Sequence, residues 1–551
     1  MSDESLSRRA FVGVSATIAA GVLTKGGEPS SRRVDGVPSS APRPPATAPL
    51  DDLTITELQE GLAAGRYTAR SLVEQYQARI ESMDKQGPTL NHVLELNPDA
   101  LTIADQRDAD RKAGRGARSP LDGIPILVKD NIDTADRMHT SAGSLALATS
   151  TPLRDSWVAE RLRAAGAVIL GKTNLSEWAN IRSTHSSSGW SGRGGQGKNP
   201  YALDRNTSGS SSGSAGAVAA SYCAAAIGSE TDGSVTSPSA ACGLVGIKPT
   251  VGLVGRSGII PISHSQDTAG PMTRTVRDAA IVLGALTGVD PRDDATKASA
   301  GKSSTDYTRF LVANGLRGAR IGVAREAFMG YSPKTDKLVE EAIALLKHEG
   351  ATIVDPANLA TANKFGDAEF DVLLYELKAD LNAYLESLGP GAPVKSLADI
   401  IRFNEENAAR EMPYFGQEIF EMAQKKGPLT DTKYKQARAK CLRMARTDGI
   451  DATMTKHRLD ALVAPTQGPV WLIDLVNGDG GGGGSFTQPA AVAGYPHITV
   501  PMGLVQGLPV GLSFVGRAWS EPTLFKLAYS YEQASKMRRP PTFAATARDA
   551  G

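Results

Sequence analysis

The chain has 551 residues, 41% of them hydrophobic, and a formal net charge of +1. A chain of this length can bury a large core. A charge so close to zero gives no general attraction to nucleic acid or anionic lipid, so we expect no nucleic-acid partner. Its three cysteines form no Cys-x-x-Cys pair and show no zinc-ligand spacing. We therefore expect no disulfide framework, no metal and no cofactor, with Cys223 and Cys242 as small core residues.

The first 50 residues differ from the rest. Arg8 and Arg9 precede a weakly apolar run at 13–23, a pattern that resembles a twin-arginine export signal over 1–25. The run is shorter than the roughly 20 residues that span a bilayer, so we expect no stable membrane insertion. Residues 26–50, rich in Pro, Ser and Ala, predict a disordered linker. Together they favour export to the periplasm or the cell exterior; the alternative is a disordered tail that happens to contain two arginines.

Residues 51–545 are predicted to form one folded catalytic domain. A capping box formed by Thr54 and Glu57 begins the first helix, and a second helix follows Thr68. Further predicted elements are helix 156–165, strand 168–170, helix 335–348, strand 352–354 and a hairpin of strands 498–504 and 509–515. This alternation predicts an α/β fold in which a large mixed sheet is sandwiched between helices.

Two stretches carry the chemistry. Residues 209–214 read Gly-Ser-Ser-Ser-Gly-Ser and lead into an Ala-rich segment, 215–226, predicted to be a helix, before Glu-Thr-Asp-Gly-Ser at 230–234. Upstream, an apolar strand-like run at 124–128 ends in Lys129. A serine hydroxyl becomes a good nucleophile only when a neighbouring base removes its proton. None of the seven histidines lies in a glycine-rich or strand-end setting, and burial can lower a lysine pKa enough to make it that base. A Ser-Lys relay is therefore predicted.

The small residues around Gly233 let backbone amides approach a carbonyl closely. Amides aimed at a developing oxyanion are often the largest catalytic contribution. The 209–216 segment has two other interpretations. A flexible linker is one, but linkers seldom lie inside an apolar region. A phosphate-binding loop is the other, but the Gly-Lys-Ser/Thr that such a loop requires is absent from this segment. The Gly-x-Ser-x-Gly pattern of other serine hydrolases does not occur around Ser234, because Thr236 holds the last position.

Several long motifs in order resemble the amidase signature family of serine hydrolases, over about residues 50–540. The matching segments are 123–131, 171–178, 209–214, 228–234, 242–250, 267–272 and 462–466. Within that family the chain is most similar to bacterial peptide amidases, through Ser-Glu-Trp at 176–178, Gly-Trp-Ser at 189–191 and Glu-Thr-Asp-Gly-Ser at 230–234. The resemblance implies a single domain with helices on both faces of a large mixed sheet, and an amidase without a cofactor.

The resemblance also implies the site residues. Ser234 is the nucleophile that forms an acyl-enzyme, Ser210 the bridging serine in a cis peptide, and Lys129 the base. The oxyanion hole is assigned to the backbone amides of Thr231, Asp232, Gly233 and Ser234.

Two positions depart from the family pattern. Asp232 stands where glycine is common, so its carboxylate is expected to turn towards substrate or a nearby donor. Thr236 stands where many relatives have arginine, which argues against small anionic amides such as malonamate.

One other lysine could serve as the base. Lys172 also ends a strand, but Asn174 and Glu177 suggest a solvated setting, so it ranks below Lys129.

The expected activity is removal of the C-terminal amide of peptides, giving free acid and ammonia. The alternatives are a broad-specificity amidase, a fatty-acid-amide hydrolase, and the glutamine-amidase component of a tRNA amidotransferase complex. A role for the glycine run 480–484 at the pocket rim is a further hypothesis; the sequence leaves the oligomeric state open.

Overall fold

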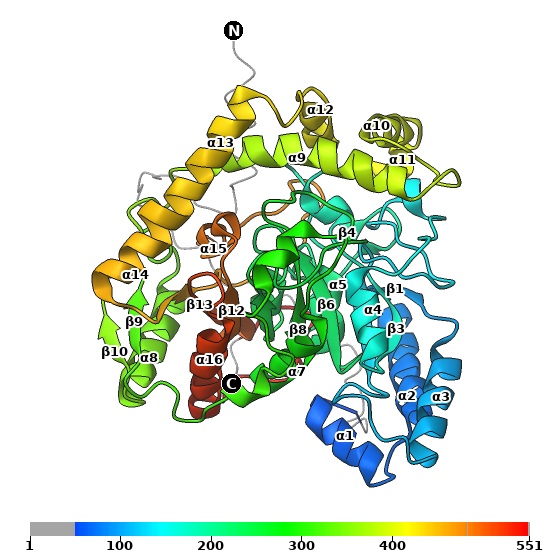
Figure 1. Cartoon of the computed structure of the whole chain (residues 1–551), viewed down its shortest axis with the longest axis horizontal. Coiled ribbons are helices and arrows are strands. Elements are labelled where there is room, and N and C mark those ends of the chain that lie inside the picture. Colours follow the sequence, from blue (N-terminus) through cyan, green and yellow to red (C-terminus); the bar gives the residue numbers. More distant parts are fainter. Residues whose placement is uncertain (1–49, 482, 549–551) are drawn as a thin grey trace, which may run out of the picture.

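The computed structural model describes residues 50–481 and 483–548. The predicted export signal, 1–25, and the linker up to residue 49 lie outside the described residues. Within the described part, helices flank both faces of one large sheet, as predicted (Figure 1). The same part contains no helix that is long and apolar enough to cross a membrane.

The central sheet has eleven strands. Their order is β1 (Val93–Leu96), β3 (Val168–Thr173), β2 (Pro125–Lys129), β6 (Ala225–Glu230), β8 (Thr268–Thr273), β7 (Val245–Lys248), β12 (His497–Val505), β13 (Leu508–Val515), β11 (Ala461–Pro465), β9 (Arg320–Val323) and β10 (Thr352–Val354). Two short strands, β4 (Trp190–Ser191) and β5 (Gly195–Gln196), pair separately.

The sheet is mixed, and its parallel part positions the candidate site. Strand β2 runs parallel to both β3 and β6, so that Val128 is level with Lys172 on one side and Ile227 on the other. Side chains near the carboxyl ends of neighbouring parallel strands meet at one edge of a sheet. Lys129, the last residue of β2, and the end of β6 are therefore brought to the same edge.

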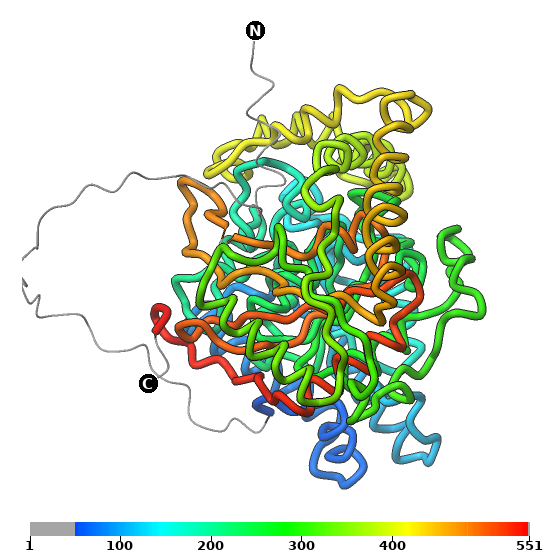
Figure 2. The backbone as a smooth tube through the Cα atoms, turned by 90° about the vertical axis from the view of Figure 1, so that its left-hand side faces the viewer, coloured from blue at the N-terminus to red at the C-terminus, as the bar shows by residue number. Residues whose placement is uncertain are grey.

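Sixteen α-helices are present in the described residues. They are α1 (Ile55–Ala63), α2 (Ala69–Ile80), α3 (Ala100–Lys112), α4 (Trp157–Ala164), α5 (Ser212–Ala219), α6 (Thr236–Ala241), α7 (Val276–Leu286), α8 (Pro333–His348), α9 (Gly366–Ser387), α10 (Leu397–Glu406), α11 (Ala408–Glu411), α12 (Glu418–Gln424), α13 (Thr432–Leu442), α14 (Asp451–His457), α15 (Gln488–Ala493) and α16 (Glu521–Ser535). In both views the yellow-green to yellow segment from α9 to α13 forms a layer at one end of the molecule (Figures 1 and 2).

Most local predictions are confirmed. Thr54 caps α1 in a capping box with Glu57, and Thr68 caps α2. Strands β12 and β13 form the predicted hairpin, in which Gln506 and Gly507 both have positive φ angles of 51° and 79°. Two consecutive positive φ angles twist the turn to match the right-handed twist of the strands.

The predicted helix over 215–226 is wrong in its second half. Helix α5 ends at Ala219, the chain turns at Ser221 with φ 58°, and the remaining alanines enter strand β6. Alanine favours helices, but here Ala225 and Ala226 pair with Thr273 and Met272 of β8, in a strand that is buried along its whole length. Tertiary packing therefore overrides propensity here.

Candidate active site

Lys129 meets two serine hydroxyls at the end of strand β2. Its ε-nitrogen donates to Ser210 Oγ at 2.8 Å and to Ser229 Oγ at 3.0 Å. Asn131 Nδ2 also donates to Ser229 Oγ, at 2.9 Å. Ser229 and Asn131 were not among the predicted site residues, although both lie inside motifs that were recognised.

Lys129 is fully buried, and no carboxylate of the described chain forms an ion pair with it. Burial lowers the pKa of Lys129 from its ordinary 10.5 to about 7, while the more distant carboxylates of Asp267 and Glu230 partly oppose this shift. A lysine with such a pKa is substantially neutral near pH 7, as a general base must be.

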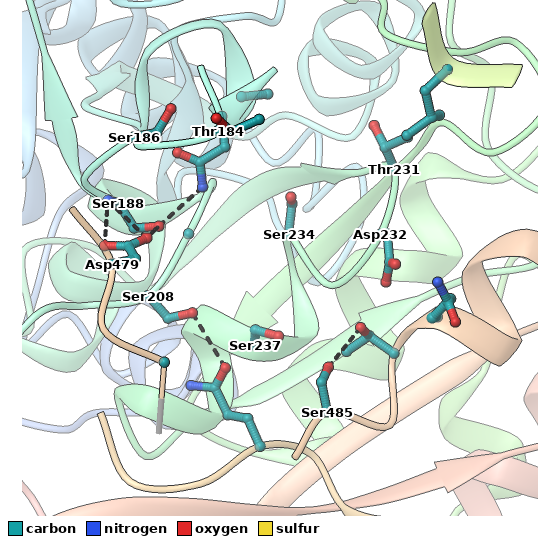
Figure 3. Close-up of a pocket in the computed structure, with 18 of the residues that line it drawn as sticks. Thr184, Ser186, Ser188, Ser208, Thr231, Asp232, Ser234, Ser237, Asp479 and Ser485 are labelled. Carbon is teal, nitrogen blue, oxygen red and sulfur yellow. Dashed lines mark hydrogen bonds between the residues drawn. The ribbon is translucent and has the colours of Figure 1, made fainter. Parts of the chain in front are cut away.

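The two serines predicted to act with this lysine lie on adjoining loops. The Gly209–Ser210 peptide bond is cis, as the resemblance implies. The next residue, Ser211, donates its backbone N–H to the Ser234 carbonyl at 3.1 Å, which ties the two loops together. Ser234 lines the pocket, and its hydroxyl makes no hydrogen bond to another described residue (Figure 3).

A buried carboxylate shapes the loop that carries Ser234. Glu230 Oε2 accepts the backbone N–H groups of Val235 and Thr236, at 2.8 and 2.9 Å. In contrast, the four preceding backbone N–H groups, at 231–234, have no acceptor among the described residues. Unpaired N–H groups are rare beside a buried site, and four in succession at a pocket wall are suited to receive an anionic oxygen.

Gly233 is required by the shape of this loop. Its φ angle is 76°, a left-handed conformation that glycine adopts without strain. A Cβ atom there would lie 2.9 Å from Ser237 Oγ and 3.1 Å from Thr487 Oγ1. Thr231 fixes the start of the loop, because its hydroxyl donates to Asp267 Oδ1 at 2.6 Å.

The pocket in front of Ser234 has a volume of about 210 Å³ and a mostly polar lining (Figure 3). Serine, threonine, asparagine and glutamine predominate, with Ile262, Phe328 and Leu373 among the few apolar side chains. No lysine or arginine of the described chain lines it. A peptide backbone, which carries amide donors and acceptors, is a good chemical match for such a wall.

The glycine-rich segment does reach the pocket, as hypothesised. Gly481 lines it together with Asp479 and Ser485. Asp479 holds the segment in place, since it accepts the backbone N–H of Ser188 at 2.9 Å and Trp471 Nε1–H at 3.0 Å. Ser188 and Asp479 lie in contact in Figure 3.

The two departures from the family pattern have different outcomes. Asp232 lines the pocket, as expected, and its Oδ1 atom is shielded from solvent without a hydrogen-bond partner among the described residues. Thr236 is fully buried, and its hydroxyl donates to Glu230 Oε2 at 3.1 Å. The Thr236 side chain therefore supports the loop and does not line the pocket.

The rival Lys172 contacts other partners than the two predicted serines, and the solvated setting expected for it was wrong. Lys172 is not solvated but fully buried, and its ε-nitrogen donates to the Ile132 carbonyl and to Thr140 Oγ1, at 2.5 and 2.8 Å. It contacts neither Ser210 nor Ser234. The buried histidines are structural as well: His92 packs against Gly216, and His497 contacts Ser513 Oγ at 2.6 Å.

One ionic cluster could not be inferred from the sequence. His264 Nδ1 lies 2.8 Å from Asp380 Oδ2, and its Nε2 lies 3.3 Å from Glu376 Oε1. The hydrogen bond to Asp380 raises the pKa of His264. The three side chains also have the donor set of a metal site. However, both imidazole nitrogens already face carboxylates, so the arrangement is accounted for as a contact that joins His264 to α9.

Comparison with known proteins places this architecture among amidases. Residues 71–525 match the family described as Amidase. The chain is 41% identical to a probable amidase from Arabidopsis thaliana, over 91% of this chain and 93% of the relative. It is 34% identical to a glutamyl-tRNA(Gln) amidotransferase subunit from Roseiflexus castenholzii, over 88% and 96%.

Solved structures agree. The peptide amidase from Stenotrophomonas maltophilia superimposes with a TM-score of 0.86 at 50% identity, covering 90% of this chain and 99% of that one. An amidase family protein from Bacillus anthracis superimposes with a TM-score of 0.81 at 37% identity, covering 89% and 92%. With a family match over most of its length, the chain belongs to the amidase signature family, as an amidase hydrolase.

Proposed function

We propose that this amidase removes the C-terminal amide of peptides through a Ser-Ser-Lys relay and an acyl-enzyme. The observation that carries the relay is the Lys129–Ser210 hydrogen bond of 2.8 Å, formed by a buried lysine that has no ion-pair partner among the described residues. Thr231, Asp232 and Ser234 line the neighbouring pocket, and the backbone N–H groups of 231–234 have no acceptor among the described residues.

In the proposed reaction, neutral Lys129 takes the hydroxyl proton of Ser210 as Ser210 takes that of Ser234. The Ser234 oxygen then attacks the carboxamide carbon, and the former carbonyl oxygen becomes an oxyanion that the 231–234 amides stabilise. The relay returns the proton to the leaving nitrogen, so that ammonia departs and an ester to Ser234 remains. Water, deprotonated by the same relay, attacks the ester and releases the free acid.

The substrate proposal rests on the lining of the pocket and on similarity. Within the described residues, the wall offers many hydroxyl and amide groups and no lysine or arginine, which suits a neutral peptide backbone better than a small anionic amide. Half of the aligned residues are identical to those of a protein described as a peptide amidase.

Other amides are the competing candidates. Several curated relatives are subunits of glutamyl-tRNA(Gln) amidotransferases, at 32–35% identity, so glutamine belongs in any assay. A broad-specificity amidase or a fatty-acid-amide hydrolase would share the relay. The predominantly polar wall argues against a long acyl chain as the preferred substrate.

The test is to incubate the purified protein with an amidated peptide, the same peptide with a free carboxyl terminus, glutamine and a long-chain fatty amide. Mass spectrometry is expected to find a gain of about one dalton at the amidated terminus alone. Internal cleavage, or faster turnover of glutamine or the fatty amide, would refute the peptide-amide proposal.

We propose further that the enzyme is exported, on the basis of Arg8, Arg9 and the apolar run that follows.

A further inference from the structure

Three carboxyl groups line the candidate active-site pocket, from Asp232, Glu369 and Asp479. Among the described residues, no lysine or arginine lines it, and its one histidine, His185, has a largely exposed side chain 3.7 Å from Glu418. Asp479 has an evident structural role, because it accepts hydrogen bonds from the backbone and hydroxyl of Ser188 and from the Trp471 ring. The other two carboxyl groups differ.

Asp232 and Glu369 have unused acceptor capacity. The Oδ1 atom of Asp232 is shielded from solvent and has no hydrogen-bond partner in the described part of the chain. Glu369, from α9, is 2% exposed and accepts one hydrogen bond on each oxygen, from Gln266 Nε2 at 2.9 Å and Gln488 Nε2 at 2.7 Å. An ionised carboxylate can accept about four, so both groups can bind a further donor.

Within residues 50–481 and 483–548, neither Asp232 nor Glu369 forms an ion pair with a cationic side chain. Lys248 acts on Asp232 from a distance, but it does not line the pocket, and its ε-nitrogen donates to the Pro249 carbonyl. Burial raises the pKa of both carboxyl groups, and the Asp232 carboxylate raises that of Glu369 further. Glu369 is buried, and Asp232 is partly buried with its Oδ1 atom shielded from solvent. Carboxyl groups in such settings without a cationic partner favour uptake of a proton or of a cation.

We infer that Asp232 and Glu369 form a subsite for a cationic group, an alkylammonium or guanidinium, on the acyl part of the substrate. The inference rests on the proposed function, since Asp232 projects from the loop of Ser234 into the same pocket (Figure 3). The cation would also assist the reaction. An ionised Asp232 beside the oxyanion amides opposes the developing negative charge, and a substrate cation offsets that carboxylate.

Two substrate groups share this chemistry: the α-ammonium of an amino-acid amide and the basic side chain of a C-terminal lysine or arginine amide. Three synthetic amides separate them. Nα-acetylnorleucinamide is the neutral reference. Norleucinamide replaces the acetylated amine by a free α-ammonium, and Nα-acetyllysinamide adds only the side-chain ammonium. The measured quantity is the ratio of kcat/KM for each cationic amide to kcat/KM for the reference.

The wild-type enzyme is expected to prefer at least one cationic amide by about tenfold, and Glu369→Gln and Asp232→Asn are each expected to lower that ratio several-fold. Using a ratio cancels any uniform loss of activity in a variant. Asp371→Asn is the matched control: Asp371 lies on the same helix but pairs with Lys426 at 2.8 Å, outside the pocket. The Asp371→Asn variant should show the same ratio of kcat/KM between cationic and neutral amides as the wild-type enzyme.

The outcomes are distinguishable. Ratios near one in the wild-type enzyme, which require no variant to fold, would overturn the subsite while leaving the amidase proposal intact. A preference that both substitutions leave unchanged, or that Asp371→Asn lowers equally, would also overturn it. Failure to hydrolyse all three amides and the amidated peptide would refute the proposed function, and this inference with it.

Discussion

The ε-nitrogen of Lys129 lies 2.8 Å from the hydroxyl oxygen of Ser210, at the end of a strand where both residues are fully excluded from solvent. Most buried lysines are held by a carboxylate, because an unpaired buried charge is costly. Here hydroxyl and carbonyl oxygens surround the amine instead, from Ser210 and Ser229. Such a setting favours the neutral amine, and thereby a proton acceptor for serine.

The first prediction concerns the three relay residues. Ser234→Ala, Ser210→Ala and Lys129→Ala are each expected to lower kcat/KM for an amidated peptide by about a thousandfold or more. The double variants should lose little beyond the worse single variant, because groups that act as one relay are non-additive. Initial rates, with circular dichroism to verify folding, provide the measurement.

Lys172→Met is the matched control for this set. Lys172 is an equally buried lysine on the neighbouring strand, but its contacts are Ile132 and Thr140. Lys172→Met should lower the free energy of unfolding, while kcat/KM of the protein that remains folded should change little. Near-wild-type turnover by Lys129→Ala would remove Lys129 from the mechanism.

The second prediction is a pH dependence. Burial lowers the pKa of Lys129 to about 7, and only the neutral amine can accept a proton. Below that value, kcat/KM should therefore fall about tenfold per pH unit, and above it should level off. Glu369 also titrates in this region, with a raised pKa. Asp232 titrates here too, since burial raises its pKa to about 7. If kcat/KM still falls below pH 7 in the double variant Asp232→Asn, Glu369→Gln, the fall belongs to the relay. If the fall disappears in that variant, it belongs to the carboxyl pair.

Stability should depend on pH through the same lysine. Between about pH 7 and the unfolded pKa of 10.5, the unfolded chain carries a proton on Lys129 that the folded protein lacks. The free energy of unfolding therefore rises with pH across this window, by up to about 1.4 kcal/mol per pH unit for each such group. Lys248, whose pKa burial lowers to about 8, acts in the same direction. Urea unfolding at several pH values should show a smaller rise for Lys129→Met than for the wild type.

Local patterns were enough to predict the part of the site that lies close in sequence. The apolar run before Lys129 and the small-residue loops around Ser210 and Ser234 determine their own backbone through burial and steric freedom. The role of Glu230 was not predicted: it lies six residues before the start of α6 and accepts the backbone N–H groups of Val235 and Thr236.

The rest of the pocket depends on contacts between distant segments. Glu369 comes from α9, and Thr487 and Gln488 from the chain beyond the glycine run, yet all three line the same pocket as Ser234. No local periodicity encodes that meeting, because it depends on how segments far apart in the chain pack together. Strand β6 was missed for a related reason: its alanines favour a helix locally, and its strand conformation depends on pairing with β2 and β8.

The third prediction concerns export. If Arg8 and Arg9 belong to a twin-arginine signal, the double Arg→Lys variant should remain in the cytoplasm of a bacterial host that has this pathway. Fractionation followed by immunoblotting measures the exported share. A single Arg32→Lys variant, outside the predicted signal, is the control and should be exported normally. Equal export of the double variant would show that the arginine pair is not a signal.

The fourth prediction tests the loop that presents the four free amides. Gly233→Ala is expected to lower kcat by about 10- to 100-fold, since the φ angle of 76° is strained for alanine and the new methyl group would lie 2.9 Å from Ser237 Oγ. Any relief of that crowding moves amides away from the oxyanion. The effect should appear in kcat more than in KM, because the lost contacts strengthen only in the transition state.

A second glycine separates backbone strain from displacement of the amides. Gly301 has nearly the same φ angle, 74°, but no atom lies within 4 Å of where its Cβ would be. Gly301→Ala should therefore incur a similar conformational cost, about 1 kcal/mol, without changing kcat. Thermal unfolding and steady-state kinetics on both variants give the comparison. If Gly233→Ala were as active as Gly301→Ala, the 231–234 amides would have no part in stabilising the oxyanion.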